Sequence, residues 1–260
     1  MFKNMKIYFL VFLTMAIILE CNSIISVEDV QNYAKNETAV VYKTKEIITG
    51  LKKIMREGYK SLQLPIIDPL QINSQNLNLN TPQFRGNVSF GAINITGLSI
   101  YNVDNISFEP KDFLLAFTMK WPKLEGLILN YNLANGKFMK IFKASASGNA
   151  IVIAKNVIYS ITASIGVNEK NSTLSIKDFN NFLSVGEKGD KNSIQIKKLG
   201  PKKLKLFSGM VNKLINNKAT KIFNDNSKLI EDNLKKIIKP SLNEFLQKKT
   251  LADLVKLYKF

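Results

Sequence analysis

The longest amphipathic segment of this chain lies near its C-terminus, at residues 208–249. Apolar residues recur there at the i, i+3, i+4 spacing of a helix with one apolar face, and Lys, Asn, Asp and Glu lie between them. One continuous helix of this length would run on the order of 60 Å. We predict a kink at Pro240, because proline removes a backbone hydrogen bond and clashes with the preceding turn. The apolar face of such a helix requires a cover from the rest of the chain.

The preceding part of the chain supplies that cover as strands, because residues 72–196 show alternating apolar and polar residues. Alternation predicts many short strands in an antiparallel sheet with one apolar face. We expect Pro122 to end one strand and Asn135-Gly136 to form a tight hairpin turn. Residues 27–59 have a helical period that ends at Gly58. The predicted fold class is therefore α+β: a long C-terminal α-helix wrapped by a highly curved antiparallel β-sheet, plus an N-terminal helix.

The first residues have the pattern of a secretory signal. Lys3 and Lys6 precede an apolar run at residues 7–19, which is too short to span a membrane comfortably. Small side chains at Cys21 and Ser23 suit cleavage after Ser23, although an uncleaved anchor is the alternative. We predict a signal peptide at 1–23 and a single domain at 24–260, secreted to the extracellular space. Cys21 is the only cysteine, so the mature chain has no disulfide, which a domain of this size tolerates.

Glycosylation acceptor triplets are consistent with export. Their asparagines, of which we expect one or two to carry glycan, are Asn36, Asn87, Asn94, Asn105 and Asn171.

The charge of the chain is strongly positive, with a formal net charge of +17 at pH 7. Such an excess favours anionic partners, including lipid headgroups, or simply keeps a secreted protein soluble. Arg56 and Arg85 are the only arginines. Because readers of nucleic acid rely on the bidentate contacts of arginine, we expect no nucleic-acid partner.

The chain lacks the usual residues of catalysis. It contains no histidine, which removes the commonest general base, the histidine-dependent triads and most zinc sites. Glycine-rich phosphate-binding motifs and the nucleophile-elbow motif are also absent. The acidic residues Asp225, Glu231 and Asp232 are interpreted as a solvated helix face. We therefore predict no catalytic residue, no metal site, no cofactor and no enzymatic activity.

A thin curled sheet over one helix leaves a large apolar interior, which is typical of a tunnel for a hydrophobic ligand. The ligand would be bound by removing its apolar area from water, about 25 cal/mol per Å². A single apolar side chain of such a strand or helix is ordinarily part of the hydrophobic core. As a set, however, the following are our candidate ligand-binding residues: Phe113, Phe117, Trp121, Leu129, Tyr131, Phe142, Leu214, Ile222 and Leu229.

Four stretches in this order resemble the insect juvenile-hormone-binding and takeout family, within the tubular lipid-binding superfamily. They are a helix from Gly50 followed by LPIIDPL at residues 64–70, GLSIYNV at 97–103, the strand and hairpin at 117–136, and IFND at 222–225 with Pro240 following. The resemblance implies a secreted carrier in which a curved sheet wraps a long helix around a tunnel. The ligand classes it implies are juvenile hormones, other terpenoids and fatty acyl chains.

The chain departs from that family at one point. The family commonly has a disulfide near the mature N-terminus, but residues 32–45 contain no cysteine. The missing bridge suits either a divergent branch of the family or a chain nearer to the disulfide-poor mite group 7 allergen relatives. An alternative function is that of a defence protein, which binds anionic membranes or microbial lipids through its basic surface.

Overall fold

The computed structural model describes residues 37–58, 65–80, 84–109, 112–138, 142–167, 174–187, 190, 192–197 and 208–247. The predicted signal peptide lies outside these residues. Three helices are described: α3 (Glu37–Glu57), α4 (Ser208–Asp225) and α5 (Ser227–Leu246). The described strands are β1 (Leu70–Asn80), β2 (Phe84–Thr96), β3 (Asn102–Glu109), β4 (Leu114–Phe138), β5 (Phe142–Val167), β6 (Leu174–Val185) and β7 (Ile194–Lys197).

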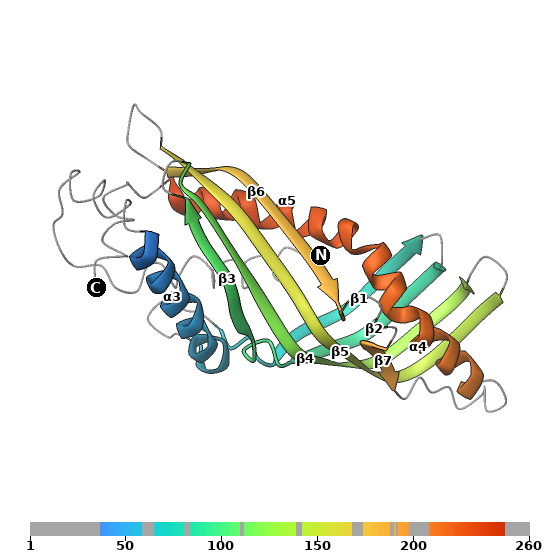
Figure 1. Ribbon diagram of the computed structural model, residues 1–260. Coiled ribbons are helices and arrows are strands. Elements are labelled where there is room, and N and C mark those ends of the chain that lie inside the picture. Colours follow the sequence, from blue (N-terminus) through green and yellow to red (C-terminus); the bar gives the residue numbers. More distant parts are fainter. Residues whose placement is uncertain are drawn as a thin grey trace.

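The strands form one large, open antiparallel sheet (Figure 1). Its main path is β1-β2-β4-β5-β6, while β3 pairs with one half of β4 and β7 pairs with β5. The N-terminal helix α3 packs against β3, at the opposite end of the molecule from α4 (Figure 1). The α+β class, the antiparallel sheet and an N-terminal helix within residues 27–59 are therefore as predicted.

Two strands are much longer than expected, since β4 has 25 residues and β5 has 26. Pro122 does not end β4: the pairs Trp121↔Val157 and Lys123↔Lys155 continue the ladder on both sides of it. Opposite Pro122, Asn156 has a positive φ of 53°. Proline is tolerated within a sheet at such irregular positions. The strand face that packs in the core changes at this point. On one side of it the core residues are odd-numbered, namely Phe117, Met119, Trp121, Val157, Tyr159 and Ile161. On the other side the residues that pack against the core are even-numbered, namely Leu124, Val152 and Ala154.

The predicted hairpin turn at Asn135-Gly136 is wrong. The pairing of β4 with β5 continues past the dipeptide to Phe138↔Phe142, and residues 139–141 lie outside the described residues. The register shifts between Leu133 and Gly136. The dipeptide therefore occupies a β-bulge. Glycine is also common at bulges, because the bulged strand departs from regular strand geometry.

The core joins α3 and α5 to one side of the sheet. Spacings of three and four residues direct one face of each helix inward. That face is formed in α3 by Ile48, Leu51 and Met55, and in α5 by Ile238, Leu242 and Leu246. Both sets belong to one cluster with the odd-numbered core residues of β4 and β5.

The proline-bracketed segment after α3 ties that helix to the loop between β2 and β3. The carboxylate of Asp68 accepts hydrogen bonds from the backbone N–H of Gly97 (2.9 Å) and from the N–H and hydroxyl of Ser99 (2.8 and 2.6 Å). The N–H groups of Ile67 and Asp68 both donate to the carbonyl of Met55. Gly97 is required here, because its φ is +92° and a Cβ would lie 2.7 Å from the Lys123 carbonyl oxygen.

The C-terminal segment is two helices, not the single long helix predicted. The break falls at Asn226, whose side-chain amide donates to the Ile222 carbonyl at 2.7 Å. Asparagine competes with helical backbone bonds in this way, which favours a helix end. Pro240, where we expected a kink, lies inside α5.

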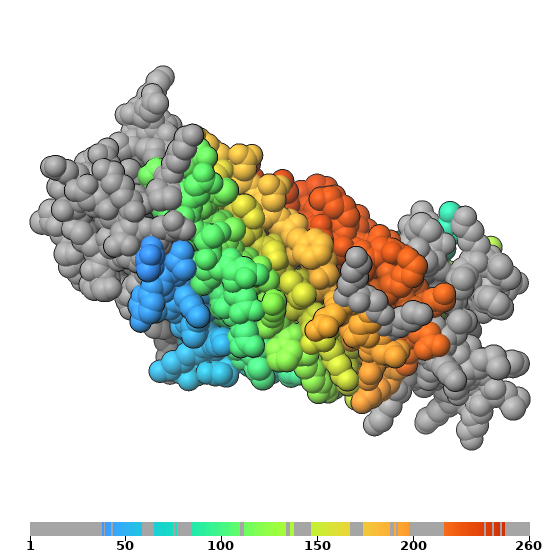
Figure 2. All heavy atoms as spheres, in the orientation of Figure 1, coloured from blue at the N-terminus to red at the C-terminus, as the bar shows by residue number. Residues whose placement is uncertain are grey.

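The sheet does not wrap around these two helices. Instead, α5 packs against β6, while α4 contacts β6 and β7. Figures 1 and 2 show the two helices following one long side of the molecule, beside β6. The helices therefore lie along an edge of the sheet, and within the described residues the main helix contacts with the sheet, those of α3 included, are to β3, β6 and β7.

Candidate functional site

The strand register aligns a continuous apolar surface across five strands. Directly paired residues on neighbouring strands point to the same face of a sheet. The pairs Ile72↔Ile93, Ile93↔Ile128 and Ile128↔Ala150 show this alignment from β1 to β5. The full set, called the apolar face below, comprises Leu70, Ile72, Ile93, Ile95, Leu124, Ile128, Ala150, Val152, Ala154, Ile194 and Ile196.

The apolar face is only partly covered. Ala150 and Ile194 are buried, and its other members are half-buried. Four of them, namely Leu70, Leu124, Val152 and Ala154, pack against the core cluster, as do Ala219 and Phe223 of α4. The face is therefore on the same side of the sheet as the helices. Within the described residues, the main helix contacts are to β3, β6 and β7 rather than to β1 and β2. An apolar surface of this extent is suited to hold an apolar molecule.

One end of the apolar face is marked by Asn130. This residue has a φ of 49°, and the register of β4 with β5 shifts between Ile128 and Tyr131. The backbone N–H of Asn130 donates to the side-chain oxygen of Asn149 at 2.9 Å. On the neighbouring strand, a Cβ at Gly91 would lie 3.4 Å from the Cβ of Asn130. The strands therefore approach closely here, and the alternation of faces is interrupted.

Two of the predicted ligand-binding residues, Phe117 and Trp121, are fully packed core residues. Their exposed fractions are 5% and 4%. The indole N–H of Trp121 donates to the Leu98 carbonyl at 2.9 Å, and its ring lies 5.6 Å from that of Tyr101. These contacts fix Trp121 within the protein.

Three further candidates on β4 and just before it lie in different surroundings. Phe113 is half-buried, with its ring 6.2 Å from that of Phe108 in an edge-to-face arrangement. Leu129 follows Ile128 directly, so alternation places it on the opposite side of the sheet from the apolar face. Tyr131 is buried, and its hydroxyl has no hydrogen-bond partner among the described residues. Burial raises the pKa of Tyr131 above its usual value.

Of the four remaining candidates, two have described side chains, and these two differ in exposure. Ile222 is half-buried, whereas Leu229 is 62% exposed because α5 turns Leu234, Ile238 and Leu242 toward the sheet. Leu214 and Phe142 belong to α4 and β5, and their side chains lie outside the described part of the structure. The structure brings the predicted set together only in part.

A row of polar side chains that was not predicted joins α4 and α5 to the sheet edge. Each accepts a hydrogen bond from a backbone N–H of β6 or β7. The pairs are Asn216 with Ile196 (2.7 Å), Thr220 with Ile194 (2.9 Å), Asn224 with Val185 (3.0 Å), Glu231 with Leu183 (2.9 Å) and Asn243 with Ile176 (2.6 Å). We call this row the polar seam. It seals edge groups that would otherwise be open to pairing with another chain.

Two members of the polar seam imitate a neighbouring strand. The side-chain amides of Asn216 and Asn224 also donate to the carbonyls of Ile196 (3.2 Å) and Val185 (2.9 Å), respectively. Each asparagine therefore satisfies both backbone groups of one edge residue. The spacing of four residues from Asn216 through Thr220 to Asn224 was visible in the sequence, and it is the signal that could have revealed the seam.

Glu231 corrects a prediction, since it is not part of a solvated helix face. It is 5% exposed, and besides the Leu183 N–H it lies 3.9 Å from the ammonium group of Lys228. Its backbone carbonyl accepts a hydrogen bond from the side-chain amide of Asn181 at 3.1 Å. The same amide donates to the Tyr159 hydroxyl at 3.3 Å. Glu231 and Tyr159 thus meet in one buried polar cluster.

This cluster predicts a loss of stability at alkaline pH. Burial, opposed by the hydrogen bond from Asn181 and reinforced by the charge of Glu231, raises the pKa of Tyr159 from 10.0 to about 12. The folded protein therefore holds this proton more tightly than the unfolded chain. The stabilisation is complete below pH 10 and is lost as pH rises from 10 through 12, by on the order of 2–3 kcal/mol.

Urea unfolding at successive pH values from 9 to 12 would measure this loss. The Tyr159→Phe variant, which cannot ionise there, should show a flatter pH dependence over the same window. Parallel curves for the two proteins would contradict the prediction.

Nowhere in the described ranges do three histidine, cysteine, aspartate or glutamate side chains gather in a way that could hold a metal ion. None of the described helices is long and apolar enough to cross a membrane.

Comparison with known proteins places these features in context. The family model for haemolymph juvenile hormone binding proteins matches residues 12–256. The crystal structure of Epiphyas postvittana Takeout 1 has the same fold, with a TM-score of 0.54 and 15% sequence identity, covering 80% of this chain and 94% of that one. A lipopolysaccharide binding protein structure gives a TM-score of 0.38 at 17% identity, over 76% of this chain and 38% of that one. A comparison with curated protein sequences finds no match.

Proposed function

Because the chain belongs to the haemolymph juvenile hormone binding protein family, we propose that it is a secreted carrier of a small hydrophobic ligand and performs no catalysis. The ligand classes that suit it are a juvenile-hormone-like terpenoid, a fatty acid or another lipid with a long apolar part. A match over most of the chain supports the carrier role, and the described residues add the surface that would perform it.

The observation that carries the proposal is the apolar face. It contains only aliphatic side chains from five strands, aligned by register, and all of them except Ala150 and Ile194 are half-buried. A ligand that buried about 200 Å² of apolar area there would gain about 5 kcal/mol from the hydrophobic effect. No ionised side chain belongs to the face, so an uncharged hydrocarbon chain meets no desolvated charge.

Secretion completes the proposal. We propose that residues 1–23 are removed as a signal peptide and that residues 24–260 form a single domain. Among the sequon asparagines, Asn87 and Asn105 have exposed side chains and are accessible for glycan, whereas Asn94 is half-buried within β2. Asn36 and Asn171 lie outside the described residues.

The carrier function predicts that the purified protein holds apolar molecules. Organic extraction of the protein, followed by mass spectrometry, should release a terpenoid or fatty acyl compound. A fluorescent fatty-acid probe should bind the extracted protein and be displaced by juvenile-hormone-like esters or by fatty acids. Heat-denatured protein serves as the control. A folded protein that yields no apolar compound and does not bind the probe would rule the proposal out.

A further inference from the structure

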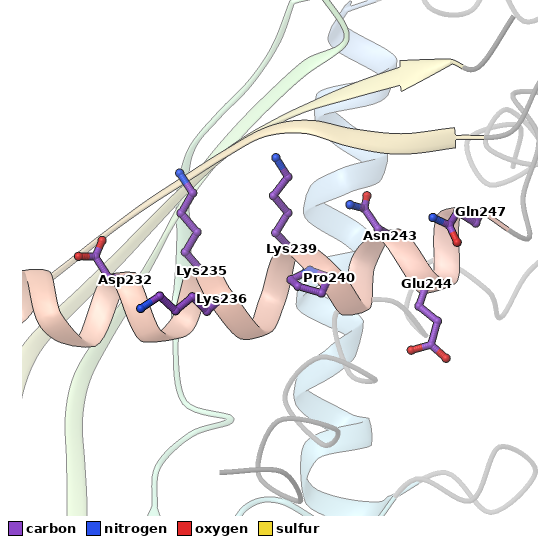
Figure 3. Close-up of a pocket in the computed structure, with 8 residues that line it drawn as sticks. All are labelled: Asp232, Lys235, Lys236, Lys239, Pro240, Asn243, Glu244 and Gln247. Carbon is purple, nitrogen blue, oxygen red and sulfur yellow. The ribbon is translucent and has the colours of Figure 1, made fainter.

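A hollow of about 730 Å³ lies along one flank of α5, and Figure 3 shows the residues that line it. Its position on α5 is set by the helical period, because Ile238 and Leu242 turn inward while the exposed Pro240 lies outward. The lining residues are Asp232, Lys235, Lys236, Lys239, Pro240, Asn243, Glu244 and Gln247.

Among the described residues, the lysines of the hollow have no counter-charge. Neither Lys235, Lys236 nor Lys239 forms an ion pair with any described residue. The ammonium group of Lys235 donates to the side-chain oxygen of Asn180 at 3.2 Å, and that of Lys239 donates to the Lys177 carbonyl at 2.5 Å. Both acceptors are neutral, so they orient the ammonium groups without cancelling their charge.

The carboxylates of the hollow do not supply the missing counter-charge. Asp232 is already paired with Lys228 at 3.2 Å. Glu244 points to the other side of the helix from Lys239 (Figure 3). Three positive charges within about one helical turn repel one another, and a bound anion would relieve that repulsion.

An exposed apolar side chain lies on the same flank. Leu229 precedes Asp232 by three residues and Lys236 by seven, which places the three on one side of the helix. Leu229 is 62% exposed and the neighbouring Ile230 is 36% exposed. Apolar side chains beside lysines on an exposed helix are typical of a segment that lies in a membrane interface.

We propose that the hollow of α5 binds the phosphate of an anionic phospholipid headgroup and so docks this flank on an anionic lipid surface. Lysine binds phosphate as a point charge, and Leu229 would enter the interface beside the headgroup. The net charge of +17 steers the protein toward such a surface. Docking uses the outer flank of α5 and the carrier function uses the apolar face, so each can fail without the other.

Co-sedimentation with vesicles tests this docking. The full chain should bind vesicles of phosphatidylcholine mixed with phosphatidylglycerol, and this binding should weaken as the salt concentration is raised. It should not bind vesicles of phosphatidylcholine alone. Replacing Lys235, Lys236 and Lys239 together by glutamine should weaken vesicle binding on the order of a hundredfold. The matched control, Lys45→Gln with Lys137→Gln and Lys218→Gln, removes the same charge at other exposed positions and should retain most of the binding.

Two further measurements keep the outcomes distinct. Displacement of the fatty-acid probe should be unchanged in the hollow variant, since the apolar face is intact. If the triple variant does not fold, Lys236→Glu at an exposed position should still weaken binding about tenfold. Equal losses in the hollow and control variants would overturn the proposal, because net charge alone would then explain binding. Release of the vesicles by low inorganic phosphate at constant ionic strength would also overturn it, in favour of a small-anion site.

Discussion

Replacing Ile128 by glutamate removes binding of the apolar ligand, whereas the same replacement at the adjacent Leu127 leaves it. Ile128 belongs to the apolar face, where it aligns with Ile93 on β2 and Ala150 on β5. Leu127 is one residue earlier and therefore points to the other side of the sheet. A carboxylate covered by a hydrocarbon ligand loses its hydration, which costs several kcal/mol. We expect the ligand dissociation constant to rise at least about a hundredfold for Ile128→Glu.

Titration with the fluorescent fatty-acid probe measures this difference directly. The two variants carry the same charge change on neighbouring residues of one strand, and both original side chains are half-buried. Thermal unfolding of each variant shows whether the fold is retained. Equal affinities for the two variants, or a larger loss at Leu127, would mean that the ligand does not bind on the apolar face.

Replacing Trp121 by alanine destabilises the protein strongly but does not alter the ligand affinity of the molecules that remain folded. The side chain is 4% exposed, contacts the Tyr101 ring and donates to the Leu98 carbonyl. Its removal leaves a large cavity and an unsatisfied carbonyl, so the free energy of unfolding should fall by about 4 kcal/mol. Trp121→Phe keeps most of the volume and should cost less.

Urea unfolding measures the stability loss at Trp121, and probe binding at low temperature measures the affinity. Phe113→Ala, at a half-buried position, is a useful comparison because its smaller burial predicts a smaller loss. The opposite result for Trp121→Ala, with stability retained and the probe no longer bound, would show that Trp121 lines the ligand site, as the sequence pattern alone suggested.

The apolar residues that the sequence pattern identified lie in different surroundings in the structure. Alternation marks Trp121 and Leu129 equally, since it reports only that one side of a strand avoids water. In the structure, Trp121 is enclosed by the segment around Leu98 and Tyr101, whereas Leu129 lies on the opposite side from Ile128. The positive φ of Asn156 and of Asn130 interrupts the alternation twice along the paired strands. A period counted along the chain therefore cannot be carried from one end of β4 to the other.

The polar residues of the C-terminal segment also show that a local pattern does not reveal long-range contacts. Its helical period was correct for Ile238, Leu242 and Leu246, which pack in the core. Its polar residues lie between the apolar ones without a predicted role, yet Asn224 bonds Val185, which is 39 residues away, and Asn243 bonds Ile176, which is 67 residues away. Nothing within the helix distinguishes an asparagine that faces water from one that replaces a missing strand.

By itself, the sequence determined the α+β class, the antiparallel sheet, the amphipathic C-terminal segment and the family. Each of these follows from local periodicity or from the order of short motifs. Only the tertiary structure decided the length of β4 and β5, the break at Asn226, the polar seam and the extent of the apolar face. These depend on backbone hydrogen bonds and side-chain contacts between residues far apart in the chain, and a local pattern contains no information about which distant groups will meet.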